Sequence, residues 1–174
     1  SAWQAVGGYP AWIDYCEDVI FDLRLQARFG PFAFAPQAVA EFRPRPDLPA
    51  FWHQYYRYAR GDGKANLWPR QHLARYAAYL GGLVLLLCGI ILYSWALMLL
   101  SAMWLGGVIA LRSLGAYRRL THTGRQLTLL QKLRAALWVP VIRITGDVAK
   151  MLGYPVGVWW RWRHRNQIPD WRHP

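Results

Sequence analysis

The chain has 174 residues, of which 55% are hydrophobic and only 17% are charged, and its formal net charge is +12. This composition disfavours a purely soluble protein. Its two cysteines lie in very different surroundings, and neither they nor its five scattered histidines have metal-ligand spacing, which disfavours a disulfide framework and a zinc site.

The N-terminal segment contains a turn and then a helix. Gly7–Gly8 is turn chemistry, because glycine permits positive φ and Pro10 follows at once. Residues 15–29 suit a helix, with Gly30 just beyond its end as the usual stop signal.

Two short strands and a second helix are predicted next. Residues 32–35 and 38–42 have the apolar composition of short strands. Asp47 is a good N-cap for a helix over residues 48–60, and the glycines of residues 61–63 should end that helix. The first part of the chain is therefore predicted to be an α/β remnant, the tail of a mixed domain too short to bury a full core alone.

A transmembrane helical hairpin is predicted over residues 71–113. Residues 76–111 carry no charge, and as one helix they would be about 54 Å long, well beyond a hydrocarbon core of about 30 Å. Two helices over about residues 76–93 and 95–112 fit instead. Arginines flank both ends, which places both termini in the cytoplasm by the positive-inside rule. The alternative is a buried helical pair in a soluble protein.

The predicted tail, residues 114–174, is basic and contains an amphipathic helix. A polar linker or short helix is expected at residues 121–133. The amphipathic pattern then covers about residues 133–152, with Arg143 and Asp147 paired on the polar face and Gly153 as the end signal. This helix is expected either to lie in the lipid headgroup plane or to pack on a catalytic domain.

The apolar segment beside the basic tail indicates which kind of partner the tail binds. Residues 112–174 have a charge balance of +10 and interleave Trp with Arg at residues 159–163. That composition can bind nucleic acid by stacking and phosphate contacts. Beside an apolar segment, however, Trp and Arg are also interfacial anchors, so membrane lipids are the preferred partner and no nucleic acid is expected.

Several motifs occur in a distinctive order. The Gly7–Gly8 turn precedes a helix that opens with the acidic pair Glu17–Asp18, and the sequence Gln-Tyr-Tyr-Arg-Tyr follows at residues 54–58. This order resembles the acceptor-side half of family 2 glycosyltransferases of the GT-A fold. The last motif is similar to the Gln-x-x-Arg-Trp motif of their membrane-embedded members, with Tyr58 in place of Trp. The resemblance covers about residues 1–70 and implies the C-terminal part of a GT-A domain.

The resemblance implies a role for each of these residues. Asp18 would be the catalytic base of an inverting sugar transfer, and Glu17 would orient it or the acceptor. The alternative is that both acids only stabilise the helix dipole. Arg57 would hold the diphosphate or the acceptor through charge-assisted hydrogen bonds, or else would contact lipid headgroups. The implied substrate-binding residues are Gln54, Arg57, Tyr58, Gly7 and Gly8.

The resemblance also implies partners that this stretch of sequence does not bind alone. Family members bind a nucleotide-sugar through an Asp-x-Asp motif and a divalent cation, Mg or Mn, and residues 1–174 contain no such motif. The chain is thus expected to be an inactive fragment of a multi-pass enzyme of the cytoplasmic membrane that acts on a lipid-linked or membrane-associated acceptor. The alternative is a non-enzymatic hairpin subunit or scaffold with a basic, Trp-rich tail.

Overall fold

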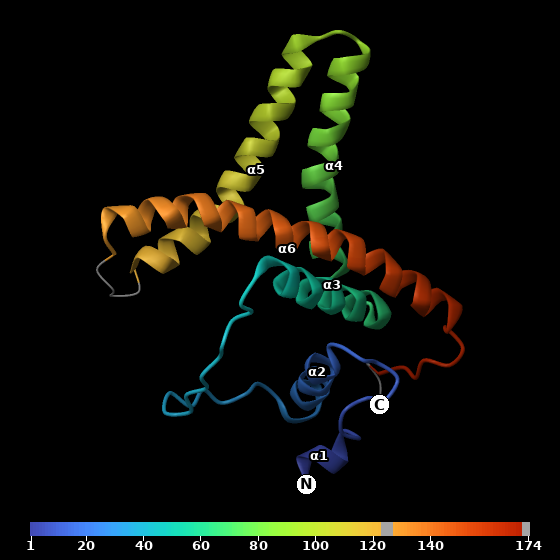
Figure 1. Cartoon of the computed structure of the whole chain (residues 1–174). Coiled ribbons are helices and arrows are strands. Elements are labelled where there is room, and N and C mark those ends of the chain that lie inside the picture. The colour runs from blue at the N-terminus through green and yellow to red at the C-terminus, as the bar shows by residue number, and fades with distance from the viewer. Residues whose placement is uncertain (123–126, 172–174) are drawn as a thin grey trace. The chain divides into compact units, whose positions relative to one another are not determined.

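The computed structural model describes residues 1–122 and 127–171, except for the side chain of His122. Helices account for 72% of these residues. The chain divides into two compact units (Figure 1). Residues 1–68 with 152–174 form one, which we call the terminal unit, and residues 69–151 form the other, which we call the hairpin unit.

The first part of the terminal unit contains three helices: α1 (Ala2–Ala5), α2 (Glu17–Phe29) and α3 (Leu48–Ala65). Gly30 ends α2 with a φ of 87°, a value that glycine adopts without strain. Asp47 caps α3, and its side chain accepts a hydrogen bond from a backbone N–H of the first turn. The predicted signals for the end of α2 and the start of α3 are therefore confirmed.

The predicted α/β remnant is wrong, because the described residues are all helical or irregular and contain no strand. Residues 32–35 and 38–42, the expected strands, form an exposed irregular segment between α2 and α3. A strand is stable only when a neighbour pairs with its backbone, and strand propensity by itself is weak and dependent on context. These residues have suitable side chains but no such neighbour among the described residues.

The predicted end of α3 at residues 61–63 is also wrong, since the helix continues to Ala65. Gly61 and Gly63 lie at close contacts between backbones. A Cβ at Gly61 would lie 2.5 Å from the carbonyl oxygen of Tyr15, and one at Gly63 would overlap the carbonyl oxygen of Tyr154. These glycines therefore allow close packing, and the left-handed Asn66, with a φ of 55°, ends the helix.

Helix α6 (Leu129–Arg163) likewise passes through its expected end at Gly153. In its last part, which belongs to the terminal unit, Gly153 and Gly157 face α3. A Cβ at either position would overlap a backbone carbonyl oxygen of α3, that of Tyr56 or of Arg60. Without side chains, the two glycines let α3 and α6 approach closely. Their role is thus in helix packing, and neither glycine ends the helix.

The core of the terminal unit is small and joins residues far apart in the sequence. Ile20 of α2 is fully buried, and Trp171 near the C-terminus packs into the same cluster. The indole Nε1 of Trp171 donates a hydrogen bond to the carbonyl oxygen of Ala65, at 3.2 Å. The other buried members of the cluster are Ile13, Cys16, Ala65 and Leu67.

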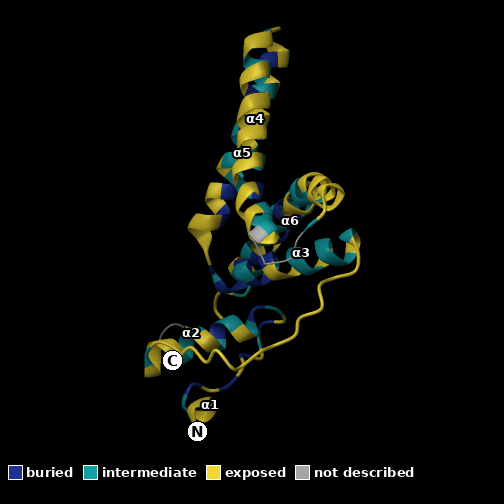
Figure 2. Ribbon diagram, turned by 90° about the vertical axis from the view of Figure 1, so that its left-hand side faces the viewer, coloured by how far each residue is buried: buried dark blue, intermediate teal, exposed yellow. Residues whose placement is uncertain are grey.

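The hairpin unit is built on α4 (Pro69–Ile91) and α5 (Trp95–His122), which pack along one another (Figures 1 and 2). The hydroxyl of Ser101 donates to the carbonyl oxygen of Gly82 at 2.7 Å, and the indole of Trp104 donates to that of Ala78 at 2.8 Å. Small residues at the contact let the helices approach closely, as in membrane helix pairs. Helix α4 begins before its expected start and ends at Ile91, slightly short of residue 93, whereas α5 continues past residue 112; both carry their flanking arginines as helical residues.

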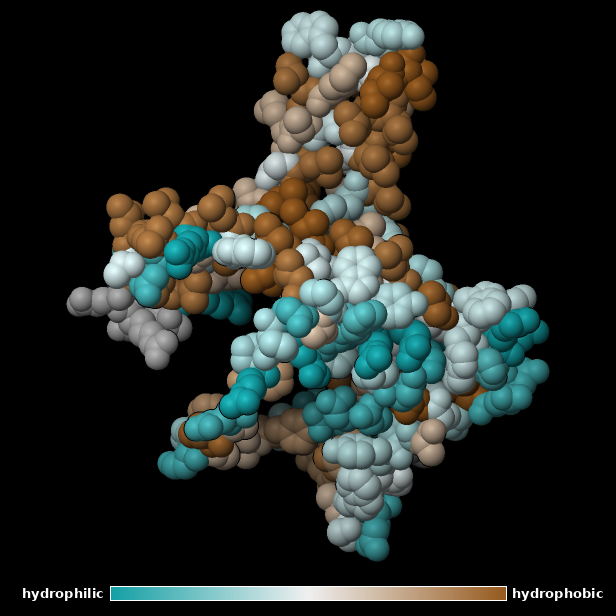
Figure 3. All heavy atoms as spheres, viewed as in Figure 1, coloured by the Kyte–Doolittle hydropathy of each residue, from teal (hydrophilic) through white to brown (hydrophobic). Residues whose placement is uncertain are grey.

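The two helices of the hairpin are long and apolar enough to cross a membrane. Within their most hydrophobic windows only 17% of the α4 residues and 11% of the α5 residues are buried. Figure 2 shows exposed residues along both helices, and Figure 3 shows that the side chains over them are largely hydrophobic. Within the described residues of the hairpin unit these apolar faces remain uncovered, as is typical of helices that contact lipid.

A buried ion cluster joins α6 to both hairpin helices. Asp147 of α6 is 2% exposed, and its carboxylate accepts hydrogen bonds from Arg75 of α4 at 3.0 Å and from Arg112 of α5 at 2.8 Å. The hydroxyl of Tyr79 donates to the same carboxylate at 3.0 Å. The predicted pairing of Asp147 with Arg143 is therefore wrong, because Arg143 donates instead to the carbonyl oxygen of Arg112.

The linker expected at residues 121–133 falls partly on residues 123–126, which lie outside the described residues. Before them α5 ends at His122, and after them Leu127 and Thr128 are irregular and α6 begins at Leu129. Helix α6 also contains Pro155, which has no N–H to offer to the carbonyl oxygen of Met151. The hydroxyl of Tyr76 donates to that oxygen at 2.6 Å, so the carbonyl is still hydrogen-bonded.

Candidate functional site

The N-terminus of α2 is held against α3 by Cys16. This buried residue precedes α2 in the left-handed conformation, with a φ of 67°. Its Sγ donates to the carbonyl oxygen of Tyr58 at 3.4 Å and lies 3.5 Å from a carboxylate oxygen of Asp62. Burial raises the pKa of Cys16, and the negative charge of Asp62 raises it further, so the side chain acts as a neutral thiol donor.

This contact places the acidic pair Glu17–Asp18 in the first turn of α2. The side chain of Asp18 is exposed, and one carboxylate oxygen accepts a hydrogen bond from the N–H of Val19 at 2.8 Å. A carboxylate here interacts favourably with the positive end of the helix dipole. The side chain of Asp18 is thus accessible to a ligand, while its backbone is fixed in the first turn of a helix.

Gln54, Arg57 and Tyr58 lie on one side of α3, which we call the α3 stripe. This stripe lies beside the acidic turn. Gln54 donates from Nε2 to the Tyr58 hydroxyl at 2.8 Å, so two residues of the predicted substrate-binding set contact each other directly. Arg57 donates to the hydroxyl of Tyr15 at 3.0 Å, and the rings of Tyr15 and Tyr58 lie 6.4 Å apart. Tyr15 therefore links the α3 stripe to the residues that precede Glu17.

The Gly7–Gly8 turn lies against a later part of α2. Both glycines have positive φ, 73° and 64°, as the turn prediction required. A Cβ at Gly8 would lie 2.8 Å from the ring of Trp3, and Trp3 packs on Phe21 with ring centroids 4.9 Å apart. The turn thus brings an aromatic side chain onto α2 and helps to position the helix that carries Asp18.

A charged cluster around Asp14 was not predicted. Asp14 forms ion pairs with Arg60 and with Lys64, whose Nζ lies 2.6 Å from a carboxylate oxygen. Burial by itself would raise the pKa of Asp14, but the hydrogen bond and charge of Lys64, with smaller contributions from Arg60 and the backbone, lower it. No local signal identifies this cluster, because its partners are 46 and 50 residues away in the sequence.

Lys64 belongs to two features of the terminal unit. Its ammonium lies 4.6 Å from the ring centroid of Trp160 of α6, a cation–π contact, and it also borders a cavity of about 460 Å³. Arg60, Asp62 and Lys64 are all helical residues of α3. The cavity lining combines cations, one acid and aromatic rings; it includes Lys64, Arg161, Arg165, Asp170, Trp162 and Trp171.

Comparison with protein families confirms the resemblance. The model of a family described as glycosyl transferase family group 2 matches residues 1–142, which include α1 to α5 and the start of α6. No curated protein and no solved structure gives a significant match.

Proposed function

The chain belongs to glycosyl transferase family group 2, and we propose that it forms the acceptor side of an inverting sugar transfer to a membrane-associated hydroxyl. The observation that carries this proposal is the position of Glu17–Asp18. The pair lies in the first turn of α2, accessible to a ligand, and Cys16 and Tyr15 join that turn to the Gln54–Arg57–Tyr58 stripe.

Asp18 is the proposed general base. Its carboxylate would accept the proton of the acceptor hydroxyl while the hydroxyl oxygen bonds to the anomeric carbon and the nucleotide diphosphate leaves from the opposite face. Acceptor binding would remove water from the exposed carboxylate and so make it a better proton acceptor at that step. Glu17, one residue earlier, would hold the acceptor or orient Asp18.

Arg57 and its neighbours on α3 would bind the substrates. One guanidinium nitrogen of Arg57 donates a hydrogen bond to the Tyr15 hydroxyl. The side chain is exposed, so its other N–H groups can donate to a phosphate oxygen. Gln54 and Tyr58 form a hydrogen-bonded pair beside it, which presents an amide and a phenol to a sugar. Tyr58 is 40% exposed, so its ring has a face available for stacking.

A nucleotide-sugar and its divalent cation, Mg²⁺ or Mn²⁺, are proposed only for a longer parent enzyme. Among the described residues, no group of three His, Cys, Asp or Glu side chains could hold a cation. The proposed reaction therefore assigns to this chain proton transfer and acceptor binding, performed by its own side chains, and assigns donor binding to another part of the parent.

We further propose that catalysis takes place at the cytoplasmic face of the plasma membrane. Helices α4 and α5 can each span a bilayer. Arg70 and Arg75 lie at the start of α4 and Arg112 lies towards the end of α5, so both open ends of the hairpin are positively charged. The positive-inside rule then places both ends in the cytoplasm. An acceptor carried by a lipid, or held at the membrane, fits this location.

The test is a pair of matched substitutions in the complete parent enzyme. Asp18→Asn should lower sugar transfer by at least about 100-fold, the usual contribution of a general base. Asp22→Asn makes the same change one turn later on the exposed face of α2, and it should leave transfer within about twofold, as surface substitutions do. Membrane insertion should be equal in both variants, as measured by resistance to carbonate extraction. Transfer retained by Asp18→Asn would exclude Asp18 as the base and would favour a non-enzymatic role for these residues.

A further inference from the structure

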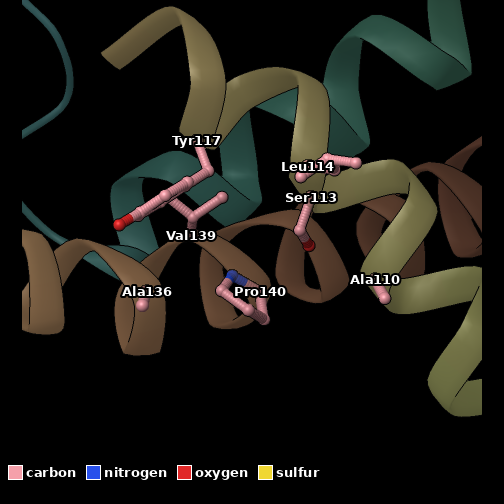
Figure 4. Close-up of a pocket in the computed structure, with 7 residues that line it drawn as sticks. All are labelled: Ala110, Ser113, Leu114, Tyr117, Ala136, Val139 and Pro140. Carbon is pink, nitrogen blue, oxygen red and sulfur yellow. The ribbon is translucent and has the colours of Figure 1, made fainter. Parts of the chain in front are cut away.

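The hairpin unit contains a pocket that glycosyl transfer does not explain. It has a volume of about 170 Å³ and lies between the second half of α5 and the first half of α6 (Figure 4). An apolar cavity of about 150 Å³ holds a benzene-sized molecule, so this one has room for several carbon atoms. Its walls are small or apolar apart from Ser113 and Tyr117, and the other lining residues are Ala110, Leu114, Ala136, Val139 and Pro140.

Ser113 supplies an unused hydrogen-bond donor inside this pocket. The residue is 7% exposed, and its hydroxyl has no hydrogen-bond partner. Figure 4 shows that the hydroxyl of Ser113 is directed from α5 towards α6, beside Pro140. A buried hydroxyl without a partner is costly, and a ligand with an acceptor oxygen would remove that cost.

A cation, Arg143, lies on α6 one turn after the pocket residues Val139 and Pro140. The Nε of Arg143 donates to the carbonyl oxygen of Arg112, the residue immediately before Ser113, at 3.2 Å. Arg143 is exposed, so the rest of its guanidinium can meet an anion. Asp147 is the only acid between residues 112 and 151, and its carboxylate is already occupied by Arg75, Arg112 and Tyr79.

The surface around the pocket exposes many apolar side chains, with cations such as Lys132 and Arg134 between them. Leu114 of α5 is exposed, and the first half of α6 exposes several large hydrophobic side chains (Figure 3). These α6 residues are Leu129, Leu130, Leu133, Leu137, Trp138 and Val141. In a chain whose neighbouring helices can span a bilayer, such a surface borders on hydrocarbon, so the pocket opens towards lipid chains.

From these observations we propose that the pocket binds one anionic phospholipid of the surrounding bilayer. The phosphate would pair with Arg143, the ester carbonyl would accept a hydrogen bond from the Ser113 hydroxyl, and the start of one acyl chain would lie against Leu114 and Ala136. The site requires the hairpin to lie in the membrane, but it does not require any part of the sugar-transfer proposal.

The test uses photocrosslinking in nanodiscs that contain the full chain. The probe is phosphatidylglycerol with a diazirine near the carbonyl end of one acyl chain, diluted into phosphatidylcholine, and labelled peptides are identified by mass spectrometry. Labelling should concentrate on peptides that contain residues 110–117 and 136–140. Unlabelled phosphatidylglycerol should compete, and additional phosphatidylcholine should not. Equal competition by the two lipids would show ordinary solvation by the bilayer and would overturn the proposal.

Four variants relate the labelling to the proposed contacts. Ser113→Ala should lower site labelling about fivefold, the effect of losing one hydrogen bond, and Arg143→Ala should lower it about tenfold, because its hydrogen bond is charge-assisted. Arg134→Ala removes another exposed arginine from the same helix and should leave labelling unchanged. Ala136→Phe should abolish labelling by filling the pocket. Helical content from circular dichroism identifies any variant that fails to fold, and unchanged labelling in folded Ala136→Phe and Arg143→Ala would refute the site.

Discussion

The two units use the same ionic arrangement, one aspartate between two cations, in very different surroundings. In the terminal unit the side chain of Asp14 is 47% exposed, and it pairs with Arg60 and Lys64. In the hairpin unit the side chain of Asp147 is only 3% exposed, and it pairs with Arg75 and Arg112. Exposed ion pairs contribute little to stability, whereas breaking a buried one leaves charges without compensation. The comparison therefore assigns the structural role to Asp147 and not to Asp14.

The terminal unit is instead stabilised by close backbone packing. Gly63 of α3 and Gly153 and Gly157 of α6 lie where a Cβ would overlap a carbonyl oxygen of the other helix. Trp171 adds an aromatic side chain to the core and a hydrogen bond to Ala65. The two units thus show two ways to join helices that are distant in the sequence: contact between backbones and buried charge.

The largest expected effect comes from Asp147→Ala. It leaves Arg75 and Arg112 without their shared carboxylate, and breaking such a pair costs about 3–5 kcal/mol in the free energy of unfolding. Urea unfolding in a non-ionic detergent, followed by circular dichroism, measures the loss. Asp147→Glu keeps the charge and should lose clearly less. Equal losses for the two variants would show that side-chain shape, and not charge, is what the cluster requires.

Gly157→Ala should have the next largest effect. The added Cβ would overlap the carbonyl oxygen of Arg60, so α3 and α6 must separate, at a cost of about 1–3 kcal/mol. Gly115→Ala is the matched control, because a Cβ there meets no atom within 4 Å, and it should stabilise α5 by up to about 1 kcal/mol. The same unfolding measurement applies, and a stabilising effect of Gly157→Ala would disprove the close helix contact.

Acidification should weaken the hairpin unit. Burial by itself raises the pKa of Asp147, but the hydrogen bonds and charge of Arg112, with those of Tyr79 and Arg75, outweigh it and lower the pKa. A carboxyl with a lowered folded-state pKa contributes stability above its unfolded pKa of about 4, and that contribution is lost as pH falls through the folded pKa. Hydrogen exchange of α4 and α5 amides should therefore accelerate as pH falls below about 4, after correction for intrinsic rates. Asp147→Asn should remove this dependence.

The smallest effect is expected for Asp14→Asn. The pKa of Asp14 is also lowered, so its contribution has the same sign and is lost in acid, but the exposed pair is screened by solvent. We expect a loss of at most about 1 kcal/mol, which should vanish in about 1 M salt. A loss as large as that of Asp147→Ala would overturn the contrast between the two units.

Much of the local structure could be read from the sequence, because helix caps and apolar runs act over a few residues. Asp47 and Gly30 marked helix ends correctly, and the uncharged run lies within α4 and α5. The strands failed because pairing needs a neighbour that local composition does not reveal. Gly61 and Gly153 were read as stop signals, since the same residue type ends a helix or lies at a helix crossing, depending on what packs against it.

For the candidate site, the sequence by itself determined which residue types follow one another: the acidic pair, the Gln-x-x-Arg-Tyr stripe and the family to which they belong. Only the tertiary structure decided which side chains meet. Tyr15 contacts Arg57 across 42 residues, and Asp147 joins Arg75 across 72 residues instead of pairing with Arg143 four residues away. The physical reason is that a buried carboxylate needs cations and hydrogen-bond donors around it, and here these come from helices that meet only when the chain folds.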